Sequence, residues 1–230
     1  MFSLLDNPIY HALHSADQSK NIGTDEVCYF DIEIAPFIGM RHWEASNQNK
    51  LLEIAPAERT WFLLIKEPVE FIDQLQVSLH LPLYQCICTS IKTSYQKNSS
   101  INLVRLNESH VDEMIALTAL TKPGPFRKRT IEFGNYHGIF EEGKLVAMGG
   151  ERLHLDGLSE VSAICTHPSA QGKGYGAHIV HFLANDILER GLTPFLHSKT
   201  DNAAAMKVYR NIGFEVREEV EFYMFRNSEK

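Results

Sequence analysis

A glycine-rich segment at residues 171–177, Gln-Gly-Lys-Gly-Tyr-Gly-Ala, has the composition of an anion-binding loop. The apolar run at 161–165 is typical of a buried strand, and apolar residues recur at helical spacing from 178 to 190. The loop therefore lies where a strand gives way to a helix N-terminus, whose unpaired backbone N–H groups and dipole attract an anion. Glycine lets the main chain approach a phosphate closely. Such a segment alone is more often an ordinary turn, and its flanks favour the binding loop.

Composition places the chain among globular proteins. Its 230 residues can bury a substantial core, as one large domain or two small ones, and 44% are hydrophobic and 22% charged. No apolar run approaches the roughly 20 residues that span a bilayer, and residues 1–6 lack the features of a secretory signal. Four irregularly spaced cysteines suit a reducing compartment. We expect a cytoplasmic protein with no membrane partner, either a monomer or a homodimer.

Charge and ligand spacing argue against nucleic-acid and metal partners. The net charge of -7 gives no basic footprint for nucleic acid, and the basic cluster at residues 127–129 is interpreted as a solvated loop. Cys86 and Cys88 lack the second ligand pair that a zinc site needs. His178 and His181 are spaced to share a metal, but an outer helix face is the more frequent setting for such a pair. We expect no bound metal.

A polar segment at residues 93–100 indicates a linker between two domains. We place a smaller N-terminal α+β domain of unassigned function at residues 1–98 and the domain with the glycine loop at residues 99–230. The N-terminal half holds no motif whose chemistry can be named. Its predicted strands lie at residues 27–36, 58–65 and 83–88, and its predicted helices at residues 7–13 and 70–75.

The second half has a clearer order of elements. A strand at residues 102–106 precedes a helix that Ser109 and Asp112 open with a capping-box pattern, and residues 122–126 break that helix. This order predicts a mixed α/β layer covered by helices. The later elements are predicted to be a hairpin at 136–140 and 145–153, strands at 160–166 and 194–198, helices at 178–190 and 203–212, and a last strand or strands at 214–226.

Two local motifs in this order resemble the GNAT superfamily of acyl-CoA-dependent N-acyltransferases. Gln171, Gly174 and Gly176 fit the pyrophosphate signature of that superfamily, (Arg/Gln)-x-x-Gly-x-(Gly/Ala), in its expected position between strand and helix. Residues 201–209, followed by Ile-Gly-Phe at 212–214, fit its N-x-x-A-x-x-x-Y…GF segment. The pyrophosphate signature alone is weak, but together with the second motif and the central strand at residues 161–168 it is a strong indication.

The resemblance covers about residues 101–226 and implies a fold. Residues 161–168 fit the central strand of the superfamily. A GNAT-type mixed, mostly antiparallel sheet with flanking helices is therefore expected, preceded by the N-terminal α+β domain. Within the superfamily, residues 165–168 and 194–197 resemble the branch that includes the glycine N-acyltransferases.

The resemblance also implies acetyl-CoA, or another short acyl-CoA, as acyl donor. Backbone amides of residues 172–177 would bind the pyrophosphate, with Lys173 adding charge. The strand at 164–166 would diverge from that at 195–197, leaving main-chain groups to pair with pantetheine and an N–H near Ile164 or Cys165 to polarise the thioester carbonyl. The full set of expected donor contacts is Ile164, Cys165, Thr166, Gln171, Gly172, Lys173, Gly174, Tyr175, Gly176, Ala177, His197, Asn202, Ala205 and Tyr209.

Acyl transfer also needs an acid and a base. The resemblance implies Tyr209 as the general acid, since a phenol with a pKa of about 10 is protonated at neutral pH; the alternative is a core aromatic. Glu160 is the first candidate for the base, although an exposed strand-edge carboxylate fits the sequence equally well. Glu151, His197 and a water molecule are the alternatives. Cys165 is not expected to act as a nucleophile, because a strand-buried thiol is usually inert.

The predicted activity is direct N-acetylation of an amine on a small molecule or peptide. A catalytically inactive CoA-binding sensor or scaffold is the alternative. An ATP-binding protein is a third reading, but the loop lacks the Gly-Lys-Ser/Thr ending that places phosphates and Mg²⁺. The N-terminal half is either a degenerate second copy of the GNAT fold or a lid over the amine pocket, with Asp31, Glu33 and Trp43 as candidate lining residues.

Overall fold

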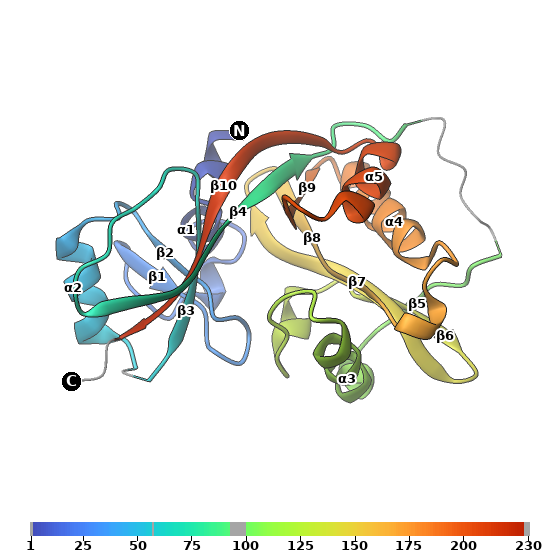
Figure 1. The fold of residues 1–230 in the computed structure, drawn as a ribbon, viewed down its shortest axis with the longest axis horizontal. Helices are drawn as coiled ribbons and strands as arrows, with labels where there is room; N and C mark the ends of the chain where they lie inside the picture. Colours follow the sequence, from blue (N-terminus) through green and yellow to red (C-terminus); the bar gives the residue numbers. More distant parts are fainter. Residues whose placement is uncertain (1, 57, 93–99, 228–230) are drawn as a thin grey trace.

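The computed structural model describes residues 2–56, 58–92 and 100–227 (Figure 1). Within these ranges, eight strands form one sheet in the order β3-β10-β4-β9-β8-β7-β6-β5. β8 (Leu158–Thr166) and β9 (Thr193–Lys199) are parallel, and the other neighbouring strands are antiparallel. The predicted mixed, mostly antiparallel α/β sheet is confirmed. The other strands of this sheet are β3 (Thr60–Ile65), β4 (Leu75–Ile87), β5 (Val104–Arg105), β6 (His137–Glu141), β7 (Lys144–Leu155) and β10 (Glu215–Asn227).

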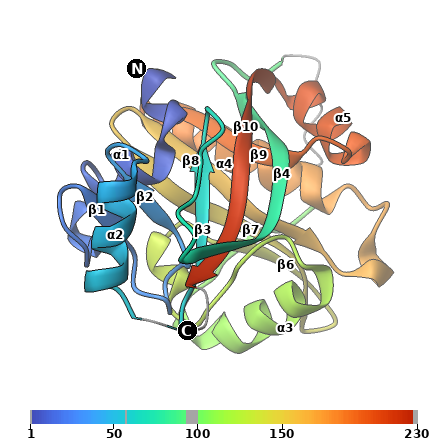
Figure 2. The ribbon, with the colours of Figure 1, turned by 60° about the vertical axis from the view of Figure 1, so that its left-hand side comes forward.

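Helices cover both faces of the sheet (Figures 1 and 2). α4 (Tyr175–Glu189) and α5 (Ala203–Ile212) pack on one face, whereas α3 (Val111–Thr121) and α1 (Pro8–Leu13) pack on the other. The adjacent β7 residues Ala147 and Met148 belong to the α4 and α3 cores respectively, as strand alternation requires. A third core lies between α2 (Ala45–Ile54), the small sheet of β1 (Val27–Tyr29) and β2 (Ile38–Met40), and β3. Short 3-10 helices lie at Phe2–Asp6, Gln18–Lys20, Glu108–His110, Thr130–Phe133 and Pro168–Ala170.

Local sequence signals account for α4 and α5. Ile179, Leu183 and Ile187, one helical turn apart, are fully buried, so a single apolar stripe holds α4 on the sheet. Asn202 caps α5, because its side-chain oxygen accepts a 3.1 Å hydrogen bond from the backbone N–H of Ala205. The helix that the sequence predicts at residues 203–212 is confirmed.

The sheet crosses the proposed domain boundary at residue 98. β4, from the N-terminal half, pairs with β9 from Leu83 opposite Lys199 to Ile87 opposite Phe195. On its other edge β4 pairs with β10, which also pairs with β3. The division into residues 1–98 and 99–230 stays a prediction, and most of the expected linker, residues 93–99, lies outside the described residues.

Three predictions about the N-terminal half and its border are wrong in detail. The strand expected at 27–36 ends at Tyr29, because Asp31 turns the chain by accepting a 2.9 Å hydrogen bond from the Glu33 N–H. No helix forms at 70–75, where the Glu70 carbonyl accepts bonds from the side chains of Trp43 and Gln48 instead of from a helical N–H.

The cap before α3 is also placed differently. Asn107, not Ser109, caps this turn by accepting a 3.0 Å bond from the Ser109 N–H, and His110 Nδ1 accepts a reciprocal bond from the Asn107 N–H. The α-helix itself begins at Val111. The reciprocal pattern is thus a capping box, shifted two residues toward the N-terminus.

Candidate active site

The parallel strands β8 and β9 separate after a short paired stretch. Their register runs only from Leu158 opposite Thr193 to Glu160 opposite Phe195. β8 then continues to Thr166 and β9 to Lys199 without pairing to each other, while β9 stays paired to β4 on its far edge. A gap edged by backbone groups therefore opens beyond Glu160. The divergence expected from the resemblance is confirmed.

A bulge in β8 coincides with this divergence. β7 pairs Gly150 with Ser162 and then Met148 with Cys165, so two residues of β8 oppose one of β7. The first of these, Ala163, has a φ of +55°, which is strained for a residue with a side chain. A bulge bends its strand and redirects the following backbone. The strain is therefore placed beside the candidate thioester position, at Ile164 and Cys165.

The glycine loop is open and lies against the end of β8. Gly172 and Gly174 have φ values of +80° and +79°, and a Cβ added at either would meet nothing within 4 Å. A Cβ at Gly176 would lie 3.6 Å from Thr166 Oγ1 and 3.8 Å from Ile164 Cγ2, so the first turn of α4 sits directly over the diverging strand. The first N–H groups of an α-helix have no acceptor within the helix.

The charged group of the loop is already paired. Lys173 Nζ lies 2.7 Å from Glu141 Oε1, and the Tyr175 hydroxyl donates to the same oxygen at 2.5 Å. These hydrogen bonds, led by that of Lys173, lower the pKa of Glu141. Lys173 and Tyr175 also border a cavity of about 340 Å³ with residues of β6 and the segment before β5. Glu141 was not predicted as a site residue, and no local pattern in the sequence indicates its pairing with Lys173.

Tyr209 packs on the α4 side of the sheet. Its ring lies 6.1 Å from that of Phe214, among the partly buried side chains over the α4 core. Burial, and to a lesser extent the nearby Cys86, raise the pKa of Tyr209 to about 12. The hydroxyl has no hydrogen-bond partner among the described residues. It is therefore protonated at neutral pH and, within residues 2–56, 58–92 and 100–227, not hydrogen-bonded to another protein group.

Glu160, the first candidate for the base, is buried and fully paired. Its side chain is 1% exposed. Arg152 donates two hydrogen bonds to the carboxylate, from Nε at 2.7 Å and from Nη2 at 2.6 Å, and His197 Nδ1 lies 2.7 Å from Oε1. Burial acts to raise the pKa of this carboxyl, but the charge of Arg152 and the hydrogen bonds from Arg152 and His197 outweigh it and hold the pKa at about 2. Such a carboxylate is a poor proton acceptor. The exposed strand-edge alternative is also wrong.

His197 is held as one tautomer. Arg217 Nη1 donates to Gln85 Oε1 at 2.7 Å, which fixes the amide nitrogen of Gln85 as the donor to His197 Nε2 at 3.1 Å. His197 Nε2 is then an acceptor and its proton lies on Nδ1, donated to Glu160. With Asp6 beyond Arg217, these groups form a cross-sheet chain through β7, β8, β9, β4 and β10: Arg152, Glu160, His197, Gln85, Arg217 and Asp6.

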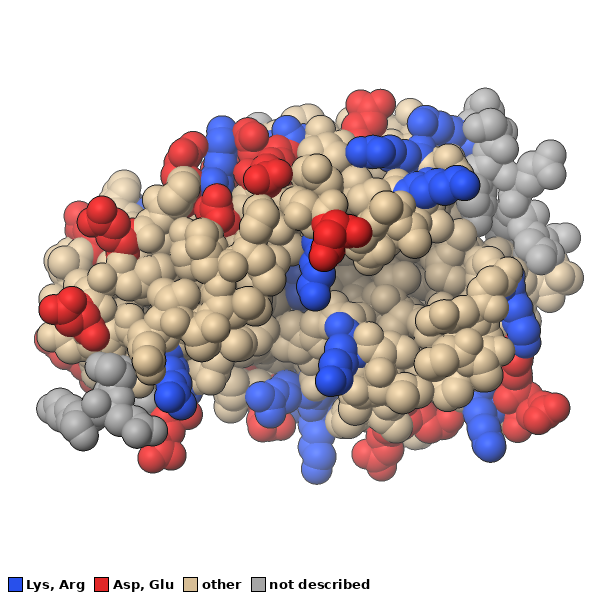
Figure 3. Space-filling model, in the orientation of Figure 1, with Lys and Arg blue, Asp and Glu red and all other residues tan. Residues whose placement is uncertain are grey.

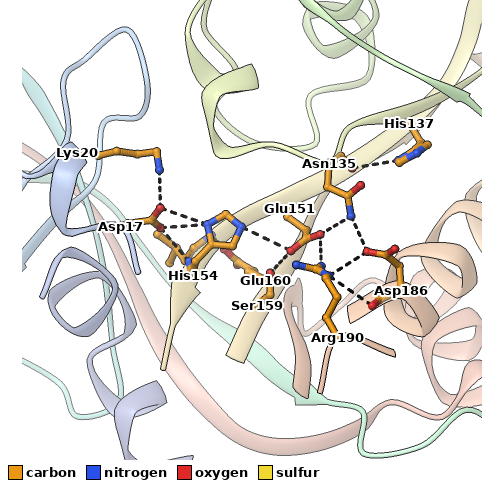
Figure 4. Close-up of polar contacts among 11 residues, drawn as sticks. Asp17, Lys20, Asn135, His137, Glu151, His154, Ser159, Glu160, Asp186 and Arg190 are labelled. Atoms are coloured by element: carbon orange, nitrogen blue, oxygen red, sulfur yellow. Dashed lines mark hydrogen bonds and ion pairs between the residues drawn. The ribbon is translucent and has the colours of Figure 1, made fainter. Parts of the chain in front are cut away.

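Glu151, the second candidate for the base, contacts Asn135 and Arg190, the residue that follows α4 (Figure 4). It is 1% exposed and pairs with Arg190 at 2.5 Å and with Asn135, Ser159 and His154. Burial acts to raise its pKa, but these hydrogen bonds, led by that of His154, lower it to about 2. The structure therefore does not bring Glu151 and Glu160 into one groove.

The N-terminal residues expected around an amine pocket lie apart. Trp43 packs against Phe71 and Phe225 in the third core, whereas Asp31 pairs with Arg129 at 2.7 Å. From the N-terminal half, the buried Gln85 contacts His197 instead. It is a polar residue in an otherwise apolar run, which was the signal available in the sequence.

Cys165 and His178 are both buried, so the outer helix face expected for His178 is wrong. Burial raises the pKa of Cys165 to about 11, which fits an inert thiol. Within the described part of the chain, the structure has no cluster of three or more histidine, cysteine or acidic side chains able to hold a metal ion. It also has no helix there that is long and apolar enough to cross a membrane.

Comparisons with known proteins place the site in a family context. A model of the FR47-like protein family matches residues 136–223, which contain both diverging strands, the glycine loop and Tyr209. A crystal structure from Novosphingobium aromaticivorans DSM 12444, assigned to the GNAT family of acetyltransferases, superposes with a TM-score of 0.88 at 28% identity, covering 98% of this chain and 99% of the other. A GCN5-related N-acetyltransferase from Kribbella flavida shares the fold, with a TM-score of 0.63 at 14% identity and 97% of each chain covered.

Curated relatives match a shorter stretch. Mycothiol acetyltransferase from Mycobacterium sp. (strain JLS) is 37% identical over 79 residues, which are 32% of this chain and 26% of the relative. Mycothiol acetyltransferase from Mycolicibacterium smegmatis is 34% identical over 80 residues, which are 33% of this chain and 27% of the relative. The chain thus covers only about a quarter of the length of these relatives. Placement in the branch of the glycine N-acyltransferases stays a prediction.

Proposed function

We propose, on the premise that this chain carries an FR47-like acetyltransferase domain of the GNAT family, that it transfers an acetyl or other short acyl group from acyl-CoA directly to an amine. The observation that carries the proposal is the separation of β8 from β9 beside the open glycine loop. The curated relatives are similar over about a third of this chain, so their acceptor is not carried over.

The loop fits a pyrophosphate. Because Gly172 and Gly174 leave free space where a Cβ would stand, an anion can reach the first-turn N–H groups of Tyr175, Gly176 and Ala177. Gln171 and Lys173 flank the same approach, and Asn202 and Ala205 begin the neighbouring helix α5. We assign to these groups the binding of the nucleotide end of the donor.

The gap between the strands fits the extended arm of the donor. Ile164, Cys165 and Thr166 on β8 and His197 on β9 have backbone groups on edges where these two strands no longer pair with each other. Acetyl-CoA supplies a thioester when bound. We assign the backbone N–H groups of the bulge to its carbonyl, as an oxyanion hole would require.

Two protons must move during the reaction. We assign to Tyr209 the proton given to the departing sulfur, since its hydroxyl is protonated and has no partner among the described residues. The low pKa of Glu160 argues against direct proton abstraction from the amine by that carboxylate. We therefore assign this proton to a water molecule, and give Glu160 the role of holding His197 and Arg152 at the mouth of the gap.

The acceptor is proposed to be an amine on a small molecule or peptide. We further propose a cytoplasmic enzyme, in line with the four buried free cysteines, that works as a monomer or homodimer without nucleic-acid or membrane partners.

Two measurements test the activity. Acetyl-CoA is expected to raise the melting temperature, whereas ATP and NAD leave it unchanged. A panel of amines is expected to contain acceptors that release free thiol above background hydrolysis. A thermal shift with acetyl-CoA but no acceptor-dependent thiol would support the sensor alternative, and no shift with any acyl-CoA would remove the proposal.

A further inference from the structure

The hairpin of β6 and β7 fastens the glycine loop at two points. Before the loop, the backbone N–H of His167 donates a 2.7 Å hydrogen bond to the carbonyl of Val146, the residue of β7 that the register shift between these strands skips. Within the loop, the side chains of Lys173 and Tyr175 both hydrogen-bond to Glu141, the last residue of β6. Basic and acidic side chains lie next to each other over this hairpin, at the lower right of Figure 3.

Glu141 joins the two residues on either side of Gly174. Lys173 Nζ lies 2.7 Å from Oε1 and 2.9 Å from Oε2 of Glu141, and the Tyr175 hydroxyl donates to Oε1 at 2.5 Å. Gly174 is the N-cap residue of α4 and has a φ of +79°. One carboxylate therefore holds the residues that flank the N-cap of the helix whose first N–H groups we assign to the pyrophosphate.

In this clasp of Glu141, Lys173 and Tyr175, Tyr175 is the fixed end and Lys173 the free end. The Tyr175 ring packs against the core under α4, whereas the Lys173 side chain is 46% exposed. A Cβ at Gly172 or Gly174 would meet nothing within 4 Å, so packing does not hold either glycine on that side. Ordering a glycine costs more conformational entropy than ordering any other residue. The position of Lys173 therefore depends on Glu141, which the Tyr175 hydroxyl orients.

Lys173 keeps a hydrogen-bond donor for an anion while it is held. An ammonium group has three N–H donors, and the two oxygens of Glu141 account for two of them. The third can bond to a phosphate oxygen without the lysine leaving Glu141. Lys173 thus adds its charge to the partial positive charge of the α4 N-terminus and offsets the negative charge that Glu141 brings to the site.

We infer that Glu141 is a positioning residue for the acyl donor: it holds Lys173, and with it residues 172–174, in the arrangement that receives the pyrophosphate of CoA. The inference rests on the proposed function. Glu141 acts through Lys173 and takes no part in proton transfer. Without Glu141, the lysine and the glycines would become ordered only when the donor binds, and the entropy of ordering them would weaken binding.

Two isosteric variants of neighbouring carboxylates test this role. Glu141→Gln and Glu142→Gln remove the same charge from the same turn, and the charge of Glu142 also acts on Lys173, but the hydrogen bonds of Lys173 go to Glu141. In calorimetric titration, we expect Glu141→Gln to raise the Kd for CoA about fivefold, because a charge-assisted contact is lost. Glu142→Gln is expected to leave that Kd unchanged or slightly lowered. A lower Kd in both variants would show that Glu141 only repels the donor, against a positioning role.

A comparison of two donors separates positioning of the loop from damage to the fold. S-acetylpantetheine carries the same thioester as acetyl-CoA but has no pyrophosphate. With an acceptor from the amine panel, Glu141→Gln is expected to raise KM for acetyl-CoA about fivefold at unchanged kcat. The same variant should keep the wild-type kcat/KM for S-acetylpantetheine. An equal loss with both donors would contradict a role at the pyrophosphate.

Hydrogen exchange in the free protein tests the clasp without a donor. The backbone amides of residues 171–177 are expected to exchange faster in Glu141→Gln than in the wild type, whereas Glu142→Gln keeps the wild-type rates. Equal exchange in both variants, or equal Kd values for CoA in the wild type and Glu141→Gln, would overturn the inference alone. No binding of CoA by the wild type would instead remove the proposed function, and the donor role of Glu141 with it.

Discussion

His197 Nδ1 and Glu160 Oε1 lie 2.7 Å apart at the point where β9 and β8, the strands that carry them, stop pairing with each other. Glu160 is in the last paired position of β8 with β9, and His197 is two residues beyond it on β9. A hydrogen bond between side chains thus spans the vertex of the gap. The cross-sheet chain that continues from it to Asp6 ties the vertex to the N-terminal half.

Replacing Glu160 by Gln is expected to destabilise the fold. The change leaves the guanidinium of Arg152 buried without its counter-charge, which costs about 3–5 kcal/mol in comparable pairs. Urea unfolding monitored by circular dichroism measures the loss. Glu141→Gln, which breaks the surface pair with Lys173, is the control and is expected to change stability little. A stability change as small as that of the control would contradict the buried-pair account.

Stability is expected to fall in alkali through His154. Burial acts to lower the pKa of His154, but its bonds to Asp17 and Glu151 outweigh this and raise the pKa to about 9. Because the folded pKa lies above the ordinary value of about 6.5, the stabilisation is complete below that value and is lost as pH rises toward 9. Unfolding free energies measured at pH 6, 7.5 and 9 should therefore decrease as the pH rises.

A histidine variant isolates the source of that slope. His154→Gln is expected to be less stable than the wild type at pH 6. Its unfolding free energy should also depend less on pH between pH 6.5 and 9. His80→Gln, which breaks a surface pair with Glu221, serves as the control and should keep the slope. If both variants still lose stability as the pH rises, a group other than His154 causes the pH dependence.

Residues 99–230 alone are expected not to form a stable domain. Without β4, the strands β9 and β10 lose the partner that lies between them, and their edges are exposed to aggregation. Expression of this fragment followed by thermal unfolding tests the expectation. Co-expression of residues 1–98 with 99–230 is the control, because it supplies β4 in a separate piece and should yield a soluble complex. A cooperative transition from the fragment alone would favour two independent domains.

Gly174→Val is expected to abolish the thermal shift with acetyl-CoA. The added side chain fills the open loop and strains a backbone with a φ of +79°. Gly191→Val is a matched control, since Gly191 has a φ of +76° and equally free space after α4 but lies outside the loop. Both variants should lose a similar amount of stability, of about 1–2 kcal/mol. Loss of the shift in both, or in neither, would count against the loop as the donor site.

Tyr209→Phe is expected to lower kcat by about a hundredfold or more while leaving the Kd for acetyl-CoA unchanged, as removal of a general acid does. Free-thiol release and calorimetric titration measure the two quantities. Because the pKa of Tyr209 is about 12, the wild type should not lose activity through this residue up to pH 10. Tyr84→Phe is the control, because Tyr84 also packs against the core under α4. This variant is expected to keep the wild-type kcat. Unchanged kcat in Tyr209→Phe would remove the role of acid.

Local chemistry made the glycine loop, α4 and α5 predictable. The cap at Asn202 and the glycines around α4 act within a few residues of the chain, so their effect is visible in sequence order. The same holds for the hairpin of β6 and β7, whose turn uses Glu142 and Gly143 at positive φ. These elements hold most of the donor side of the site.

The partners of Glu160 were beyond local reasoning. Arg152, His197 and Gln85 come from three different strands, and the pairing of β4 between β9 and β10 depends on contacts across more than a hundred residues. Sequence spacing therefore indicated a carboxylate at the start of the central strand but not that it is buried and paired. The false helix at residues 70–75 has a related origin, because the Glu70 carbonyl is bonded by the side chains of Trp43 and Gln48, more than twenty residues earlier in the chain.

The place of β10 has a consequence for synthesis of the chain. β10 pairs with β3 on one edge and with β4 on the other, so neither N-terminal strand has its neighbour until residues 215–227 have been made. The edges of β3 and β4 that face β10 therefore stay unpaired until the ribosome has completed the second half of the chain. We expect folding to be slow and late in translation, with chaperones most needed between the synthesis of β4 and that of β10.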